Sequence, residues 1–102
     1  MKKYNKLVRD LIPEIIQADN KKCKTKIVEG KEKEIYLENK LQEEVNEYFQ
    51  DKNLEELADV MEVLFGLADS LGYTEKDLIE KRNEKLKLRG GFKKGIILEE
   101  VN

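Results

Sequence analysis

Residues 32–71 read EKEIYLENKLQEEVNEYFQDKNLEELADVMEVLFGLADSL, and this stretch decides the fold. Its first half, residues 32–50, is rich in Leu, Glu, Lys and Gln and contains no Gly or Pro, which predicts a long helix. Asn53 is then a typical N-cap for a second helix, with Glu56 at the third helical position as its capping-box partner. That helix is expected to run to about Leu71, because a glycine follows.

Helices are also expected on both sides of this stretch. Upstream, apolar residues at helical spacing predict a short helix that starts near Ile12, with Pro13 in its first turn. Downstream, Thr74 is the expected N-cap of a third long helix, with Asp77 at the third position, and this helix continues to about Leu88. The predicted fold class is therefore all-α, a helical bundle of three long helices and one short N-terminal helix.

Two β-prone segments lie near the ends of the chain. Residues 25–28 include Thr, Ile and Val, and residues 92–101 include three consecutive apolar residues at 96–98. Both compositions are typical of short strands. We expect the two segments to pair as a small two-stranded sheet beside the helices.

The composition narrows the possible functions. A chain of 102 residues predicts one domain spanning residues 1–102, and a net charge of −2 excludes a strongly basic nucleic-acid binder. There is no histidine and Cys23 is the only cysteine, which excludes histidine catalysis, internal disulfides and His- or Cys-rich metal sites. No apolar run approaches the roughly 20 residues of a membrane span, and no signal peptide is recognisable. We expect a soluble cytoplasmic protein that binds neither nucleic acid nor membranes.

Carboxylates on the two central helices occupy unusual positions. On a helical wheel of about 100° per residue, Glu44 falls in the middle of an apolar stripe, where an uncompensated charge is costly. Glu47 follows three residues later at the edge of that stripe. Glu56 and Asp59 have the same spacing on the next helix, which carries two apolar stripes and is expected to be buried on two faces. Two such helix faces brought together would place four carboxylates around one point.

Four like charges share a site only with a compensating cation. Oxygen ligands without His or Cys favour Mg²⁺ or Mn²⁺, so Glu44, Glu47, Glu56 and Asp59 are the predicted metal ligands. Simpler interpretations stay open: Glu56 serves only the capping box, Asp59 only complements the helix dipole, and Glu47 is solvated. Glu44 is the hardest to explain without a cation or a paired Lys or Arg.

The last long helix carries basic residues on the same side as its apolar residues, namely Arg82, Lys85 and Arg89. They are candidate ligands for substrate phosphates, as is Lys40 at the edge of the carboxylate stripe. The alternative is that these long side chains only extend past apolar contacts to solvent. A further polar cluster before the first helix has no interpretation from the sequence alone: Tyr4, Lys6 and Arg9.

Several motifs together resemble a known family. The segment KLQEEVNE at 40–47, followed by ELAD at 56–59, looks like the EExxE…ExxD signature of the MazG-like superfamily of all-α nucleoside triphosphate pyrophosphohydrolases. The opening YNKLVRD at 4–10 with IPE at 12–14, and RGGF at 89–92, resemble its phosphoribosyl-ATP pyrophosphohydrolase-like subgroup. The resemblance covers nearly the whole chain.

The resemblance implies an Mg²⁺-dependent enzyme that cleaves a nucleotide between its α- and β-phosphates, giving a nucleoside monophosphate and pyrophosphate. It implies metal binding by Glu44, Glu47, Glu56 and Asp59, with Glu43 or Glu44 orienting or deprotonating the attacking water. It also implies a homodimer or homotetramer with the site near a subunit interface. The chain lacks the Ser-Tyr-Thr-like segment of the histidine-pathway enzymes and extends past their usual end. The expected substrate is therefore either phosphoribosyl-ATP-like or a house-cleaning nucleoside triphosphate.

Two other classes of protein remain as alternatives. One is a non-catalytic helical interaction module in which Glu44 pairs with an Arg across the bundle. The other is a nucleotide-binding regulator that keeps the metal site but turns over poorly. Metal dependence distinguishes the first from an enzyme, and product release distinguishes the second.

Overall fold

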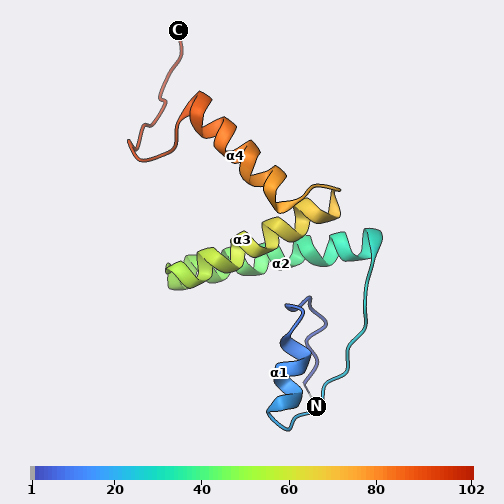
Figure 1. Ribbon diagram of the computed structural model, residues 1–102. Coiled ribbons are helices and arrows are strands. Elements are labelled where there is room, and N and C mark those ends of the chain that lie inside the picture. The colour runs from blue at the N-terminus through green and yellow to red at the C-terminus, as the bar shows by residue number, and fades with distance from the viewer. Residues whose placement is uncertain (1) are drawn as a thin grey trace.

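The computed structural model describes residues 2–102 and contains four helices: α1 (Ile12–Ala18), α2 (Gly30–Asp51), α3 (Leu54–Ser70) and α4 (Glu75–Arg89) (Figure 1). The predicted all-α class is confirmed. The predicted two-stranded sheet is wrong, because residues 2–102 contain no strand. In this part of the chain no helix combines the length and the apolarity needed to cross a lipid bilayer.

The two β-prone segments lie at separate places in the fold. Residues 25–28 lead into α2, whereas residues 92–101 leave the far end of α4 (Figure 1). A turn also interrupts the second segment near its start, where the Gly95 N–H donates to the Phe92 carbonyl at 3.1 Å. A β-prone sequence forms a sheet only where a partner strand lies alongside it, and neither segment has one within residues 2–102.

Helices α2 and α3 pack side by side as a helical hairpin (Figure 1). Lys52 reverses the chain in a left-handed backbone conformation, with φ at 46°. Asn53 then caps α3, as predicted, by accepting a hydrogen bond from the Glu56 N–H at 2.9 Å. Because the connection is so short, the last turns of α2 lie opposite the first turns of α3.

The hydrophobic core lies between these two helices. Leu37 of α2 is 5% exposed and Val63 of α3 is 7% exposed. At Gly66 the helices approach so closely that a Cβ atom would lie 2.9 Å from Cδ2 of Leu37. Any side chain at that position would therefore force the Leu37 side chain, or the helix that carries it, to shift.

Only one face of α3 is buried in the single chain, although its sequence predicted two. The outward stripe remains 41–81% exposed, and its members are Leu54, Leu57, Met61 and Leu64. The helix can bury both stripes only if something beyond this chain covers the second one.

Helix α4 is stabilised by the capping box at its N-terminus rather than by a hydrophobic core. Thr74 and Asp77 form the predicted capping box, with the Asp77 N–H donating to Thr74 Oγ1 at 3.0 Å and the Thr74 N–H donating to Asp77 Oδ2 at 2.9 Å. The helix contains no buried residue, and α3 is the one helix it contacts within residues 2–102. It projects away from the hairpin, which gives the molecule extents of 61 × 31 × 23 Å (Figure 1). The radius of gyration is 17.7 Å, against about 13 Å for a compact chain of this length.

Helix α1 begins at Ile12, as predicted, with Pro13 in its first turn. It packs against no other helix within residues 2–102. The preceding segment, residues 2–10, is instead the part of the N-terminal region that reaches α2 and α3, through side chains described below. We call this segment the N-terminal arm.

Candidate metal centre

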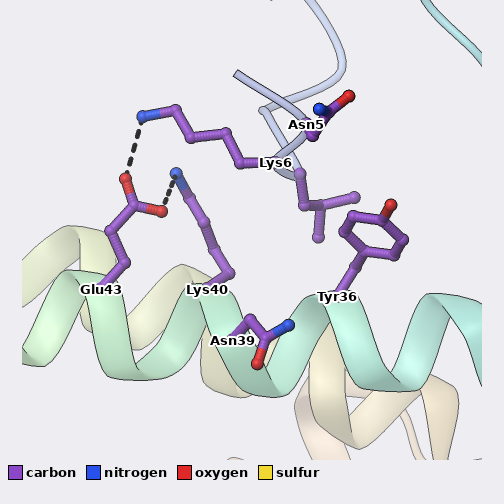
Figure 2. Close-up of a pocket in the computed structure, with 7 residues that line it drawn as sticks. Asn5, Lys6, Tyr36, Asn39, Lys40 and Glu43 are labelled. Atoms are coloured by element: carbon purple, nitrogen blue, oxygen red, sulfur yellow. Dashed lines mark hydrogen bonds and ion pairs between the residues drawn. The ribbon is translucent and has the colours of Figure 1, made fainter. Parts of the chain in front are cut away.

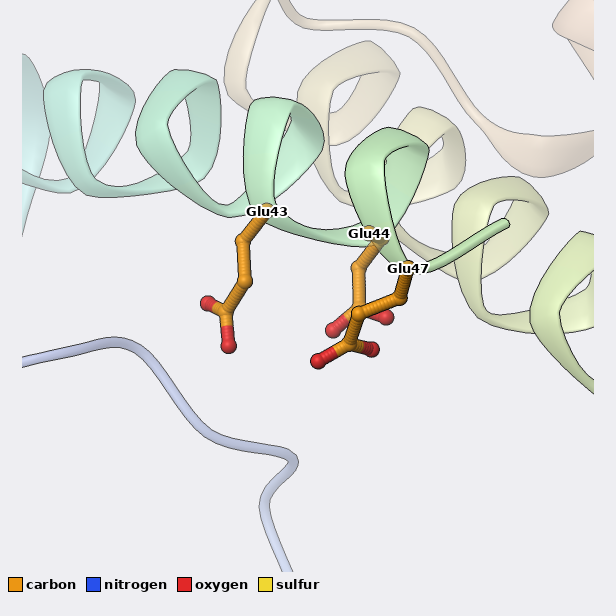
Figure 3. A group of neighbouring side chains, drawn as sticks. All are labelled: Glu43, Glu44 and Glu47. Carbon is orange, nitrogen blue, oxygen red and sulfur yellow. The ribbon is translucent and has the colours of Figure 1, made fainter. Parts of the chain in front are cut away.

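Five carboxylates gather where the last turns of α2 face the first turns of α3. Single oxygens of Glu43, Glu44 and Glu47 all lie within 4.8 Å of one another, and the same holds for Glu44, Glu56 and Asp59. Figure 3 shows the first three side chains projecting from one side of α2. Glu44 belongs to both groups, so the structure brings the four predicted ligands and Glu43 together around Glu44.

Glu44 is the most buried charged side chain of this cluster. It is 6% exposed, and its Oε1 lies 3.1 Å from Nζ of Lys40 one helical turn earlier. Its Oε2 is buried and has no hydrogen-bond partner within residues 2–102. The expected partner of the interaction-module alternative, an Arg across the bundle, is not observed in this part of the chain. Lys40 compensates only one of the two oxygens.

Glu56 does not play the capping role that the sequence suggested. Asn53 accepts the N–H of Glu56, but the return bond from the Glu56 carboxylate is absent in the described structure, so the predicted capping box at α3 is only half formed. The carboxylate instead lies with Glu44 and Asp59, and its Oε2 is buried without a partner. Two unpartnered carboxylate oxygens therefore face one small region.

The N-terminal arm supplies two cations that the sequence left unassigned. Nζ of Lys6 lies 2.9 Å from Oε1 of Glu43, and Nη2 of Arg9 lies 2.6 Å from Oδ1 of Asp59. Figure 2 shows Lys6 and Lys40 both directed at Glu43, with Lys40 Nζ 3.4 Å from its Oε2. The basic residues of the arm are visible in the sequence, but these contacts join residues 37 and 50 positions apart.

The carboxylates of the cluster differ in whether a neighbouring lysine offsets their negative charge. At Glu43, burial pushes the pKa upward, but the hydrogen bond from Lys6 and the charge of Lys40 outweigh it and hold that pKa below its usual value. The same hydrogen bond raises the pKa of Lys6. On the other side, the adjacent Glu44 carboxylate and then burial raise the pKa of Glu47. Burial, followed by the charges of neighbouring carboxylates, raises the pKa of Glu56.

The basic residues predicted to bind phosphate fall into two sets. Lys40 lies inside the cluster, bound to Glu43 and Glu44. The other set, Arg82, Lys85 and Arg89, lies on α4. Within residues 2–102 that helix contacts α3 but not α2, and it does so at the end of α3 away from the carboxylates. The structure therefore does not bring these three residues to the cluster within one chain.

The donor set of this cluster suits a hard divalent cation. All donors are carboxylate oxygens, Glu44 and Glu56 each keep an unpartnered buried oxygen, and Glu47 and Glu56 have no ion pair within residues 2–102. Comparison with protein-family models, with curated proteins and with solved structures gives no match for this chain.

Proposed function

We propose that this chain is an Mg²⁺-dependent nucleotide pyrophosphohydrolase of the MazG-like type, with Mn²⁺ as a possible substitute. It would hydrolyse a phosphoribosyl-ATP-like nucleotide or a house-cleaning nucleoside triphosphate to a nucleoside monophosphate and pyrophosphate. The observation that carries the proposal is the buried, unpartnered Oε2 of Glu44 at the meeting point of five carboxylates. A buried carboxylate oxygen without a partner is costly, and a cation held by oxygen ligands removes that cost.

The metal ligands in this proposal are Glu44, Glu47, Glu56 and Asp59. Their spacing of three residues on each helix, together with the short turn between α2 and α3, supports this assignment. When bound, a divalent cation would offset phosphate charge and lower the pKa of a bound water.

Glu43 is the proposed group that orients or deprotonates the attacking water, with Glu44 as the other candidate. Glu43 is held on one side by Lys6 at 2.9 Å and on the other by Lys40 at 3.4 Å (Figure 2). Two cations fix its carboxylate in place, which suits a group that must hold a water in one orientation.

The proposed phosphate ligands within one chain are Arg9 and Lys40. They are bound to the proposed metal ligands Asp59 and Glu44, so a divalent cation would compete with them for those carboxylates. A side chain released in this way would lie beside the metal, where the phosphate oxygens of a nucleotide must also lie. Arg82, Lys85 and Arg89 would hold pyrophosphate only if α4 of another copy brought them to the site.

We also propose a homodimer or homotetramer in the cytoplasm. The exposed apolar stripe of α3, residues 54–64, supports an oligomer, because an uncovered apolar face of this kind usually marks an interface. Cys23 is a free thiol, which fits a reducing compartment.

The decisive experiment incubates the full chain with Mg²⁺ and a panel of nucleoside triphosphates and phosphoribosyl-ATP. Anion-exchange chromatography then resolves the products. We expect monophosphate and pyrophosphate in equal amounts, and no products when EDTA replaces Mg²⁺. Arg9→Ala should lower the rate while the increase in melting temperature caused by Mg²⁺ persists, because Arg9 is not a metal ligand here. A matched control is Lys22→Ala, an exposed cation outside the arm.

Two outcomes would reject the mechanism. Nucleoside diphosphate with orthophosphate as the main products would mean cleavage at a different bond. No turnover on any nucleotide, together with an Mg²⁺-dependent shift in melting temperature, would instead favour the nucleotide-binding regulator.

A further inference from the structure

A groove lies at the end of α3 that is farthest from the carboxylates. It has a volume of about 750 Å³ and runs between the last turns of α3 and the first turns of α4. Its apolar wall consists of Leu64, Leu67, Ala68, Leu71, Tyr73 and Leu78. Leu71 and Tyr73 are 68% and 59% exposed, so no segment of residues 2–102 fills the groove.

The segment after α4 carries five large apolar residues and makes little contact with the rest of the chain. Its large apolar side chains are 76–99% exposed, namely Phe92, Ile96, Ile97, Leu98 and Val101. The segment leaves the end of α4 that lies away from the groove (Figure 1). We call residues 92–101 the C-terminal tail. The chain thus carries an unfilled apolar groove and an unburied apolar segment at two separate places.

The start of the tail is opposite in charge to one side of the groove. Three acidic residues and one basic residue line the α4 side of the groove: Asp77, Glu80, Glu84 and Lys81. The side chains of Glu80 and Glu84 are more than half exposed, and each forms one surface ion pair within α4, with Lys76 and Lys81. The tail begins with two adjacent cations, Lys93 and Lys94, and its two acidic residues, Glu99 and Glu100, lie near its other end. A tail lying in the groove can therefore place its lysines beside acidic residues and its apolar side chains on the apolar wall.

We propose that the C-terminal tail of one copy of this chain fills the α3–α4 groove of a second copy, reciprocally. The accessible surface of the chain is 9721 Å², against about 6,000 Å² for a compact protein of 12 kDa. A stable dimer buries about 2,000–5,000 Å² in total, and the excess surface is large enough to supply this. The proposal does not depend on the metal centre or on the enzymatic activity.

Insertion of the C-terminal tail into the groove of its own chain is less favourable than insertion into the groove of a second copy. For that, the chain would have to reverse at Gly90 and Gly91 and run back along α4. Lys93 and Lys94 would then lie beside Lys87 and Arg89, which are the basic last turn of that helix. In a second copy the tail approaches the groove from outside, so its lysines avoid that repulsion.

Charge reversal in two separate chains tests the exchange of tails. One variant carries Lys93→Glu and Lys94→Glu, and the other carries Glu80→Lys and Glu84→Lys. Each variant alone sets like charges against each other in both grooves of a homodimer, whereas a mixed dimer restores opposite charges in both. Random pairing of the two variants would make half of all dimers mixed. If repulsion weakens each homodimer about tenfold, native mass spectrometry should instead show about nine-tenths of the dimers as mixed.

A matched control separates contact at the groove from general charge attraction. Lys22→Glu with Lys24→Glu makes the same change in net charge on exposed lysines outside the tail, and its mixture with the groove variant should stay near the statistical half. Circular dichroism of each variant checks the helix content, because Glu80→Lys and Glu84→Lys also replace the ion pairs with Lys76 and Lys81 by like charges within α4. Deleting residues 92–102 should also weaken the dimer at least tenfold. Statistical mixing of the tail and groove variants, or a wild-type chain that stays monomeric, would overturn the proposal.

Discussion

The α2–α3 hairpin and helix α4 of this chain are stabilised by different interactions. The hairpin buries Leu37 and Val63 between two helices and places a charged cluster beside that core. Helix α4 buries no residue and depends on a capping box, and the tail after it leaves its apolar side chains in solvent. Local hydrogen bonds thus fix where α4 begins, whereas the carboxylate cluster needs two helices held together by packing.

The largest difference between the two regions should appear when a large apolar side chain is shortened. Leu37→Ala removes a nearly buried side chain and should lower the free energy of unfolding by about 3 kcal/mol. Leu88→Ala, at a position 74% exposed near the end of α4, should change it by less than about 0.5 kcal/mol. Urea denaturation followed by circular dichroism measures both values. Equal losses would mean that α4 is packed as tightly as the hairpin in solution.

The second effect concerns the buried carboxylate of the hairpin. Glu44→Gln should lower pyrophosphate release at least about a hundredfold and abolish the increase in melting temperature with Mg²⁺. The metal-free melting temperature should stay equal or rise, because an incompletely compensated buried charge is removed. Glu38→Gln is the matched control, since Glu38 is an exposed carboxylate on the same helix. A large fall in metal-free melting temperature would instead indicate that the Glu44–Lys40 ion pair is structural.

A smaller effect is expected when the N-cap side chain of α4 or of α3 is removed. Thr74→Ala removes one bond of the capping box at α4 and should cost about 1 kcal/mol locally, which appears as lost amide protection in the first turns of α4. Asn53→Ala removes the side-chain cap of α3, but packing against α2 should keep that helix protected. Hydrogen exchange measured by NMR distinguishes the two. Similar loss of protection in both helices would mean that packing against α2 does not protect α3.

The smallest effect is a pH dependence confined to the hairpin cluster. The folded-state pKa values of Glu47 and Glu56 are raised above 4.5, so the stability linked to them is present below about pH 4.5 and is lost as the pH rises through the raised values. Glu43 has the opposite sign, because its lowered pKa gives stability above 4.5 that is lost as the pH falls. Mg²⁺ should therefore raise the melting temperature more at pH 7.5 than at pH 4.5. An Mg²⁺ effect independent of pH would argue against these carboxylates as ligands.

Much of this molecule follows from local sequence. The starts of α1, α3 and α4 were predictable from Pro13, Asn53 and Thr74, because a proline in the first turn or a cap acts over only a few residues. The burial of Glu44 was predictable in the same way, because residues at helical spacing share one face. These features depend on contacts within about one helical turn, which the order of residues alone specifies.

The tertiary structure decided what lies far apart in the chain. It brought Lys6 to Glu43 and Arg9 to Asp59, contacts that no periodicity encodes. It left the two β-prone segments without a partner strand in residues 2–102, and it turned the Glu56 carboxylate toward Glu44 rather than toward its cap. It also carried α4 and its basic residues away from the carboxylates. Each of these outcomes depends on how two elements far apart in the chain pack against each other. The local sequence of one element does not determine its distance from the other.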